Sequence, residues 1–491
     1  MKQPVFDFKR ELSENVLSRF FIAGQWSPVD GALRRTLIDP STEAPMCDVP
    51  LASFSDIDHA VAAARQAFDL GPWAQLSGPQ RATHLRLFAE IVNDRLPLLT
   101  RLWTAQVGAP VAFAGRFSGF APAMLDYYAQ LAETFEFTQV RETFEGKADV
   151  IRQPVGVVAL IAPWNAQLPI LAYKLGAALA AGCTVIIKSP PESPFDALVL
   201  AECAEEAGIP DGVINVVTAD RDEGAYLVAS HGVDKVSFTG STAVGKTIAN
   251  VCIQRMARFT LELGGKSAAI ILDDADLQAT VGALAHFSMP FSGQICFAQT
   301  RLLVPQSRHE EFVSAYTQAI ASLAVGDPWD DTTHLGPVAS ATQYERVLAY
   351  IQSGLDEGAR IVTGGSRAKG HGSGFFIEPT VFVDVTPEMT IARQEIFGPV
   401  VVIMAYEDDA HALRLANDSD FGLSGSVFST STERAAAFAR QIKTGNVTIN
   451  GLQMAPNVPF GGFKQSGMGR EGGPEGLDAF LESQAIYLPS V

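Results

Sequence analysis

Two short segments of the chain carry side chains that could perform covalent and acid–base chemistry. Glu262 precedes the pair Gly264–Gly265, where the backbone can approach a substrate closely, so its carboxylate could act as a general base. Cys296 follows a Gly-Gln loop in which a thiol can be reached, and its thiolate could act as a nucleophile. Each residue also has a simpler interpretation, because Glu262 could be a surface charge beside a loop and Cys296 a structural cysteine.

Two further segments place polar groups directly after apolar, strand-like runs. Asn165 follows the run 155–161, and its amide could donate to a developing oxyanion or could instead cap the next helix. The segment Phe238–Ser241 leads into a helix from Thr242, which puts backbone N–H groups and the helix dipole where a phosphate could bind. Its glycine spacing differs from GxGxxG, so the segment alone does not identify a dinucleotide site.

The elements that would position these groups alternate between strand and helix. This alternation predicts an α/β fold with a mostly parallel, Rossmann-like sheet, helices on both faces and ligands at the carboxyl ends of the strands. A second alternating region predicts a second α/β domain. The expected strands are 155–161, 183–188, 213–217 and 235–238 in the first region and 268–272, 301–304, 400–405 and 447–450 in the second, with helices at 168–181, 196–206 and from 242.

Other parts of the chain lie outside this alternation. Residues 57–68 and 81–92 have apolar positions at helical spacing. Residues 135–151 alternate like strands, with Gly146 as a candidate turn residue, and the tail 484–491 is similar. Because exposed strands need pairing, we expect these two segments to form an arm that pairs elsewhere, for instance with another subunit.

The composition excludes several classes of function. The 491 residues carry a net charge of -18 without any cluster of Lys or Arg, which disfavours nucleic-acid binding and anionic membrane surfaces. The most apolar long stretch, 168–187, contains Pro169, Lys174 and Gly182, so we expect no membrane span and, given the polar N-terminus, no signal peptide. The five cysteines are widely spaced, which predicts reduced thiols in a cytoplasmic protein and no metal site.

Taken together, six segments resemble the aldehyde dehydrogenase superfamily in order and spacing. Cys296 follows Glu262 by 34 positions (296 − 262), as is typical of that family. The resemblance extends from about residue 20 to the C-terminus. The matching segments are Pro163-Trp164-Asn165, Phe238-Thr239-Gly240-Ser241, Glu262-Leu263-Gly264-Gly265-Lys266, Gly293-Gln294-Ile295-Cys296, Glu395-Ile396-Phe397-Gly398-Pro399 and Pro459-Phe460-Gly461-Gly462.

The resemblance implies catalytic roles for four residues. Cys296 would attack the aldehyde carbonyl to give a thiohemiacetal, whose oxyanion the Asn165 amide and the Cys296 backbone N–H would hold. Hydride transfer to the nicotinamide would leave a thioester, and Glu262 would activate the water that releases the acid. Glu471 would relay that proton, since Gly469-Arg470-Glu471 also matches the family pattern.

The resemblance also implies a binding site for NAD(P). Glu395 would hold the nicotinamide ribose with Phe397 near the ring, and Lys188 would hold the adenine ribose. Trp164 and Ser241 would line the pyrophosphate channel. The full set of cofactor-binding residues is Ile161, Trp164, Lys188, Pro191, Gly240, Ser241, Gly245, Leu263, Glu395 and Phe397.

One departure from the family pattern concerns the choice between NAD and NADP. The family often has an acidic residue three positions after the lysine that matches Lys188, where it repels a 2′-phosphate. This chain has Pro191 there, and Glu192 is displaced by one position. We still expect NAD, because no Arg lies nearby in the sequence to pair a 2′-phosphate, and NADP stays open.

The resemblance places the substrate tunnel between the helix after Asn165, the flanks of Cys296 and the loop before Phe460. No Arg falls in these segments, and we expect Lys174 and Lys464 to face elsewhere. A carboxylate-bearing aldehyde would need a basic partner, so the sequence predicts a medium-sized apolar or aromatic aldehyde. The expected substrate-pocket residues are Ile170, Tyr173, Ile295, Phe297, Met454 and Phe460.

Two alternative functions compete with the hydrolytic reaction. A CoA-acylating aldehyde dehydrogenase would pass the thioester to CoA, but a water-activating Glu262 argues against it. A non-catalytic binding or structural protein on the same fold would not need Cys296, Glu262 and Asn165. From the resemblance we expect an NAD(P)-binding domain at 1–130 and 151–262, a catalytic domain at 263–450, an oligomerisation arm at 131–150 and 472–491, and a homodimer or homotetramer.

Overall fold

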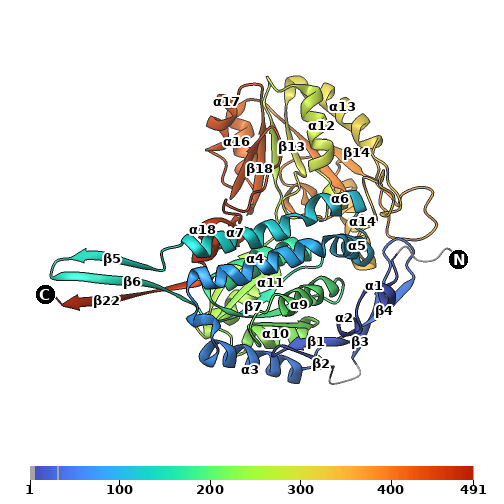
Figure 1. Ribbon diagram of the computed structural model, residues 1–491. Helices are drawn as coiled ribbons and strands as arrows, with labels where there is room; N and C mark the ends of the chain where they lie inside the picture. Colours follow the sequence, from blue (N-terminus) through green and yellow to red (C-terminus); the bar gives the residue numbers. More distant parts are fainter. Residues whose placement is uncertain (1–5, 30–32, 490–491) are drawn as a thin grey trace.

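The computed structural model describes residues 6–29 and 33–489, and expectations that touch 1–5, 30–32 and 490–491 lie outside the described residues. The elements form two stacked α/β parts and a long, thin arm of strands that projects from one of them (Figure 1). Both sheets expected from the sequence are present. None of the described helices combines the length and the apolar character needed to cross a bilayer.

The first sheet has eight strands in the order β2-β1-β9-β8-β7-β10-β11-β21, and its five central strands run parallel. The chain passes outward from β7 through β8 and β9 and then returns to the other side of β7 for β10 and β11. Open α/β sheets bind ligands at such a reversal, outside the carboxyl ends of the strands. The strands are β1 (Arg19–Ile22), β2 (Gln25–Pro28), β7 (Val157–Ile161), β8 (Thr184–Ser189), β9 (Ile214–Thr218), β10 (Lys235–Thr239), β11 (Arg258–Glu262) and β21 (Gly467–Met468).

The register of the parallel strands brings predicted site residues to one edge of this sheet. Ile161 at the end of β7 pairs with Lys188 on β8 and with Phe238 on β10. Thr239, the last residue of β10, pairs with Glu262, the last residue of β11. Residues far apart in the sequence therefore lie side by side where the strands end.

Helices cover both faces of the first sheet. Val158 and Leu160 of β7 point into one apolar core and Val157 and Ala159 into the other, which explains why this strand is apolar at every position. The helices on the first face are α4 (Gly78–Asp94), α7 (Phe120–Thr134), α8 (Gln167–Ala181) and α9 (Phe195–Glu206), and those on the second are α3 (Phe54–Leu70), α10 (Arg221–Ala229) and α11 (Thr242–Gln254).

The second sheet has seven strands in the order β14-β15-β16-β13-β12-β18-β19, all parallel except the edge strand β14. The four strands expected in this region are present, whereas β14, β15 and β18 were missed. The strands are β12 (Ala268–Ile271), β13 (Arg301–Pro305), β14 (Arg360–Thr363), β15 (Thr380–Val383), β16 (Val400–Tyr406), β18 (Ser424–Phe428) and β19 (Asn446–Ile449), with helices α12 (Leu277–Phe287), α13 (His309–Ala321), α14 (Ala341–Asp356), α16 (Asp409–Asn417) and α17 (Thr432–Ala439).

The two strand-like segments outside the sheets pair with each other. β5 (Thr138–Thr143) and β6 (Gly146–Pro154) form a hairpin, and β22 (Leu481–Pro489) runs antiparallel along the whole of β6. The hairpin turn consists of residues 144–145, so the prediction of Gly146 as a turn residue is wrong by one position: it is the first residue of β6 and has a φ of 141°. In this three-stranded sheet β5 and β22 form the two edges (Figure 1).

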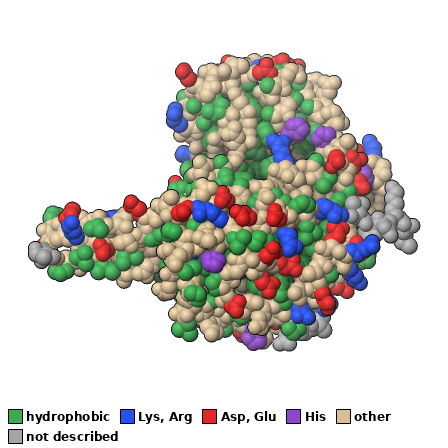
Figure 2. All heavy atoms as spheres, in the orientation of Figure 1, with side chains coloured by type: hydrophobic (Ala, Val, Ile, Leu, Met, Phe, Trp, Pro, Cys, Tyr) green, Lys and Arg blue, Asp and Glu red, His purple; other side chains and the backbone are tan. Residues whose placement is uncertain are grey.

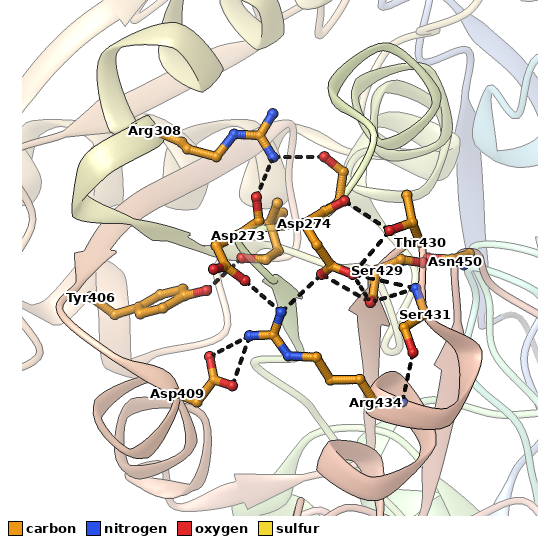
Figure 3. A network of polar contacts seen from close by, with 12 residues as sticks. Asp273, Asp274, Arg308, Tyr406, Asp409, Ser429, Thr430, Ser431, Arg434 and Asn450 are labelled. Atoms are coloured by element: carbon orange, nitrogen blue, oxygen red, sulfur yellow. Dashed lines mark hydrogen bonds and ion pairs between the residues drawn. The ribbon is translucent and has the colours of Figure 1, made fainter.

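A polar network ties together the loops at the carboxyl edge of the second sheet (Figure 3). Asp274 follows β12 and accepts a hydrogen bond from Ser429 Oγ at 2.7 Å, just after β18. Arg434 on α17 contacts Asp273 at 2.5 Å and Asp409 at 2.8 Å. The network joins the loops that follow the strands, whereas the loop that carries Cys296 precedes β13 and therefore lies at the opposite edge of the sheet.

Candidate active site

The loop that carries Cys296 has an unusual backbone. Phe291, Ser292 and Gly293 all have a positive φ, of 48°, 53° and 75°. A Cβ on Gly293 would lie 1.9 Å from the carbonyl oxygen of Gly398, so only glycine fits against this neighbouring loop. The Ser292 hydroxyl donates to the Gly336 carbonyl at 2.7 Å. These contacts fix the turn that precedes the thiol.

Asn165 lies beside this loop and is 5% exposed. Its side-chain Nδ2 donates to the carbonyl oxygen of Gln294 at 2.8 Å. The alternative role of Asn165 as a helix cap is wrong, because Ala166 is the N-cap of α8 and the cap has no side-chain hydrogen bond. The Asn165 amide therefore belongs to the surroundings of Cys296.

Glu262 ends β11 and is 3% exposed. Among the described residues, neither carboxylate oxygen of Glu262 has a hydrogen-bond partner. Burial raises the pKa of Glu262 well above its usual value, and the nearby charge of Glu471 raises it further, while Lys174 acts in the opposite direction. Glu262 is thus a buried carboxylate with a high proton affinity, and its alternative interpretation as a surface charge is wrong.

Glu471 is held by a buried lysine. Lys174 on α8 is fully buried and donates from Nζ to Glu471 Oε1 at 2.5 Å and to Ser237 Oγ at 3.1 Å. The charges of Glu471 and Lys174 both act on Glu262, so the ion pair lies near that carboxylate and could exchange a proton with it. Lys174 and Lys464 were expected to face away from the tunnel. Lys174 donates to Glu471 and Ser237, and Lys464 donates to the Asn417 carbonyl at 2.8 Å.

The surroundings of Cys296 favour its protonated thiol form over the thiolate. Burial raises the pKa of the Cys296 thiol, and the carboxylates of Glu395 and Glu262 raise it further. For Cys296 to act as a nucleophile, another group would have to accept its proton. The unpaired Glu262 carboxylate in the same cavity can do so.

Cys296, Glu262 and Glu471 line a cavity of about 630 Å³. The remainder of its wall is mostly apolar and aromatic. Aromatic rings pack around it, with 6.0 Å between the ring centres of Tyr173 and Phe460 and 6.1 Å between those of Phe297 and Phe460. All six residues expected in the substrate pocket line the cavity, namely Ile170, Tyr173, Ile295, Phe297, Met454 and Phe460.

Sequence reasoning missed one wall of this cavity. Helix α6 (Val111–Ser118), which follows α5 (Leu96–Val107), contributes Phe113, Arg116 and Phe117, and α7 contributes Phe120. The statement that no Arg falls in the pocket-forming segments holds only for the segments considered, because Arg116 comes from a helix outside them. Positions 113 and 117 lie one helical turn apart, and this spacing of two aromatic residues is the feature of the sequence from which a helix facing the cavity could have been predicted.

Two residues expected to bind the cofactor, Glu395 and Phe397, lie in the loop that leads into β16, and Glu395 contacts the turn that follows β11. Glu395 Oε1 accepts a hydrogen bond from the backbone N–H of Gly265 at 2.9 Å. Burial raises the pKa of Glu395 to about 7. The rings of Phe397 and Trp164 meet edge to face, with centres 5.6 Å apart. These residues form one group although they come from three distant segments.

Several residues expected to bind the cofactor lie around the N-terminus of α11, beside the first sheet. Ser241 caps α11 by accepting from the N–H of Val244 at 3.4 Å, so the helix N-terminus can face a phosphate. A Cβ on Gly245 would lie 2.6 Å from the side chain of Leu263, and one on Gly240 would lie 2.5 Å from the Phe238 ring. The two glycines are needed for this packing within the protein, and the N-terminus of α11 offers the backbone N–H donors that the phosphates of NAD(P) would need.

The turn after Lys188 corrects one expectation. Pro191 is buried in that turn. Its neighbour Glu192 forms an ion pair with Arg35 at 3.4 Å. Arg35 also contacts Asp220 at 3.2 Å. The expectation that no Arg lies nearby is therefore wrong in space, because Arg35 comes from a segment more than 150 positions away in the sequence. The preference for NAD loses that supporting argument.

The comparisons with known proteins agree on the family. The model of the aldehyde dehydrogenase family matches residues 26–486. Geranial dehydrogenase from Castellaniella defragrans is 45% identical over 95% of this chain and 98% of its own length. The 3-succinoylsemialdehyde-pyridine dehydrogenase of a Pseudomonas species is 42% identical, again over 95% of this chain and 98% of its own length.

Solved structures give the same result. The Mycobacterium tuberculosis aldehyde dehydrogenase complexed with NAD+ superposes with a TM-score of 0.95 at 40% identity, covering 96% of this chain and 98% of that one. A mutant of aldehyde dehydrogenase C from Pseudomonas syringae, complexed with NAD+ and octanal, gives 0.94 at 36% identity, covering 97% of both chains. The family and the fold predicted from the sequence are confirmed, and the chain belongs to the aldehyde dehydrogenase family.

Proposed function

We propose that this aldehyde dehydrogenase oxidises medium-sized apolar or aromatic aldehydes to carboxylic acids with NAD as cofactor. The observation that carries the proposal is the cavity of about 630 Å³, which has apolar walls and contains the Cys296 thiol and the Glu262 carboxylate. The names of two similar proteins point the same way, since one is a geranial dehydrogenase and another was solved with octanal.

The first half of the reaction forms a covalent bond to the protein. Cys296 Sγ attacks the aldehyde carbon, and its proton passes to Glu262. The Asn165 amide has two N–H groups, of which one donates to Gln294 and the other can donate to the oxyanion together with the Cys296 backbone N–H. The resulting thiohemiacetal loses a hydride and becomes a thioester.

NAD supplies the hydride acceptor when it is bound. Glu395 would hold its nicotinamide ribose, Lys188 its adenine ribose and the N-terminus of α11 at Ser241 its pyrophosphate. The edge-to-face pair of Trp164 and Phe397 would enclose the nicotinamide end. NAD is favoured because similar structures were solved with NAD+, and Arg35 is already paired with two carboxylates.

The second half of the reaction releases the acid. Glu262 first passes the proton that it accepted from Cys296 to the ion pair of Glu471 and Lys174, which lies beside it. It then takes a proton from water, whose oxygen attacks the thioester carbon and expels the Cys296 thiolate, and returning that proton to the thiolate restores the thiol. An active base in the cavity favours hydrolysis over transfer to CoA, so addition of CoA should not give acyl-CoA.

An aldehyde panel tests the proposal by following absorbance of the reduced cofactor with NAD and with NADP. We expect hexanal and benzaldehyde to be oxidised with a higher kcat/KM than succinic semialdehyde, and NAD to be preferred. The Cys296→Ser variant should lose activity by several orders of magnitude, because it lacks the nucleophile. Full activity of that variant, or a preference for succinic semialdehyde, would overturn the proposal.

We further infer the organisation around this site. The NAD-binding domain would comprise 1–130 and 151–262, the catalytic domain 263–450, and the arm 131–150 and 472–491. The exposed apolar residues Val140 (62%), Phe144 (110%) and Tyr487 (76%) on the arm support its use between subunits of a homodimer or homotetramer. A reducing cytoplasm would keep the Cys296 thiol free.

A further inference from the structure

The lining of the catalytic cavity has an uneven distribution of charge. Its acidic residues, Glu262 and Glu471, are 3% and 4% exposed and lie with Cys296 at the buried end. Its other titratable side chains with basic character, Arg116, His286 and His334, are all exposed and so mark the mouth. A basic mouth is unexpected in a chain with 54 Asp and Glu against 36 Lys and Arg.

Arg116 faces the cavity because of its place on helix α6. The helix contributes Ala112, Phe113, Arg116 and Phe117 to the lining, and residues at this spacing share one face of a helix. The guanidinium lies 5.8 Å from the centre of the Phe117 ring. Within the described part of the chain, no carboxylate forms an ion pair with Arg116. Its charge at the mouth is therefore available to a ligand.

His286 and His334 bring two imidazole rings together on the wall of the mouth. His286 comes from the last turn of α12 and His334 from the loop before Leu335, and their ring centres are 6.3 Å apart with the planes inclined by 25°. His334 Nδ1 accepts a hydrogen bond from the N–H of Ala324 at 3.3 Å, so its proton is on Nε2, which can donate. Figure 2 shows histidine and Lys/Arg side chains beside a hollow between the two α/β parts.

Apolar side chains occupy the length of the cavity between the two ends. Phe113, Phe117 and Phe120 line it from α6 and α7, and Met454 and Phe460 from the C-terminal part of the chain. A carboxylate placed among these rings would be desolvated without a partner, which is costly. A carboxylate on a longer chain would pass the rings and reach Arg116, where a charge-assisted hydrogen bond can form.

We propose that the preferred substrates are long, apolar aldehydes with a carboxylate at the far end, which Arg116 binds together with His286 and His334. This inference rests on the proposed function, because it takes the aldehyde group to lie at Cys296. It also refines the expectation against acidic aldehydes, which then applies to short acids such as succinic semialdehyde only.

Three substrates of equal chain length test the inference. We would measure kcat/KM with NAD for 10-oxodecanoate, its methyl ester and decanal. The wild-type enzyme should prefer the acid to the ester, and the preference should fall as ionic strength rises, because the pairing site is exposed. Arg116→Gln should lower the acid-to-ester ratio about fivefold, the size typical of an exposed charge pair. His286→Gln/His334→Gln should lower the same ratio by a smaller factor.

Arg440→Gln is the matched control. Arg440 is an exposed residue at the end of α17 outside the cavity lining, so this variant changes the net charge equally and should keep the wild-type ratio. Equal use of acid and ester by the wild type, or an equal loss for all three substrates in Arg116→Gln, would overturn the inference. Failure of the proposed function is distinguishable, because then decanal itself would not be oxidised.

Discussion

Burial and a like charge act on Glu262 in the same direction. Both raise its pKa, so a larger fraction of Glu262 is protonated at neutral pH than for an exposed glutamate. Only the deprotonated form can take a proton from water. The rate of thioester hydrolysis should therefore rise with pH as Glu262 loses its proton, and single-turnover hydrolysis should show an ascending limb at higher pH than an exposed glutamate would give.

The Glu262→Gln variant separates the two halves of the reaction. A glutamine cannot act as a base, so steady-state turnover should fall by about 10²- to 10⁴-fold, the usual contribution of a general base. One equivalent of reduced cofactor per site should still form in a burst, but more slowly than in the wild type, because Glu262 also accepts the Cys296 proton. An ascending pH limb that persists unchanged in this variant would show that another group is the base.

The residues of the site differ in how far the sequence could reveal them. Cys296, Glu262 and Asn165 were predicted as site residues because several ordered segments resemble a family, although each residue alone had a plainer interpretation. Arg116 and Arg35 were missed because their neighbours are distant in the sequence and only the packing of α6 and the pairing near Lys188 bring them close. No local pattern in a single sequence predicts that two such distant residues lie close together in the fold.

The turn before Cys296 shows the constraints on a single element. Gly293 has a φ of 75° and no room for a Cβ beside Gly398, so Gly293→Ala should destabilise the protein by at least about 1–3 kcal/mol and lower activity. Gly282, in the interior of α12 with open space around its Cβ position, is the control. Gly282→Ala should stabilise by about 0.5–1 kcal/mol in urea denaturation. A neutral Gly293→Ala would contradict the strained turn.

One of the strands that the sequence missed, β18, has a clear physical reason for being overlooked. β18 carries Ser424 and Ser426, which are buried but polar, and Ser426 donates to the Gln299 side chain at 3.3 Å. Internal hydrogen bonds thus satisfy side chains whose polarity hides the strand from an apolar pattern. The strands β7 and β12 were found because their residues are apolar and buried on both faces.

At the scale of the whole molecule, the net negative charge opposes the association of subunits, whereas exposed apolar surface favours it. A net charge of -18 makes two copies repel, so association needs buried apolar area to offset it. The arm supplies both an unpaired edge at β5 and exposed apolar side chains, with Val140 at 62% and Phe144 at 110% exposure. We therefore expect the arm, and not the acidic surface of the two domains, to hold the subunits together.

Replacing Val140 and Phe144 by aspartate tests this expectation. Burial of a phenylalanine contributes about 1.5–3 kcal/mol, so its loss together with two added charges should raise the dissociation constant of the assembly by at least roughly tenfold. Sedimentation velocity over a range of concentrations would measure the shift. Leu70→Asp is the control, because Leu70 is 82% exposed at the end of α3 and away from the arm. If the double variant keeps the wild-type mass at every concentration while Leu70→Asp dissociates, the interface lies on the body of the molecule instead.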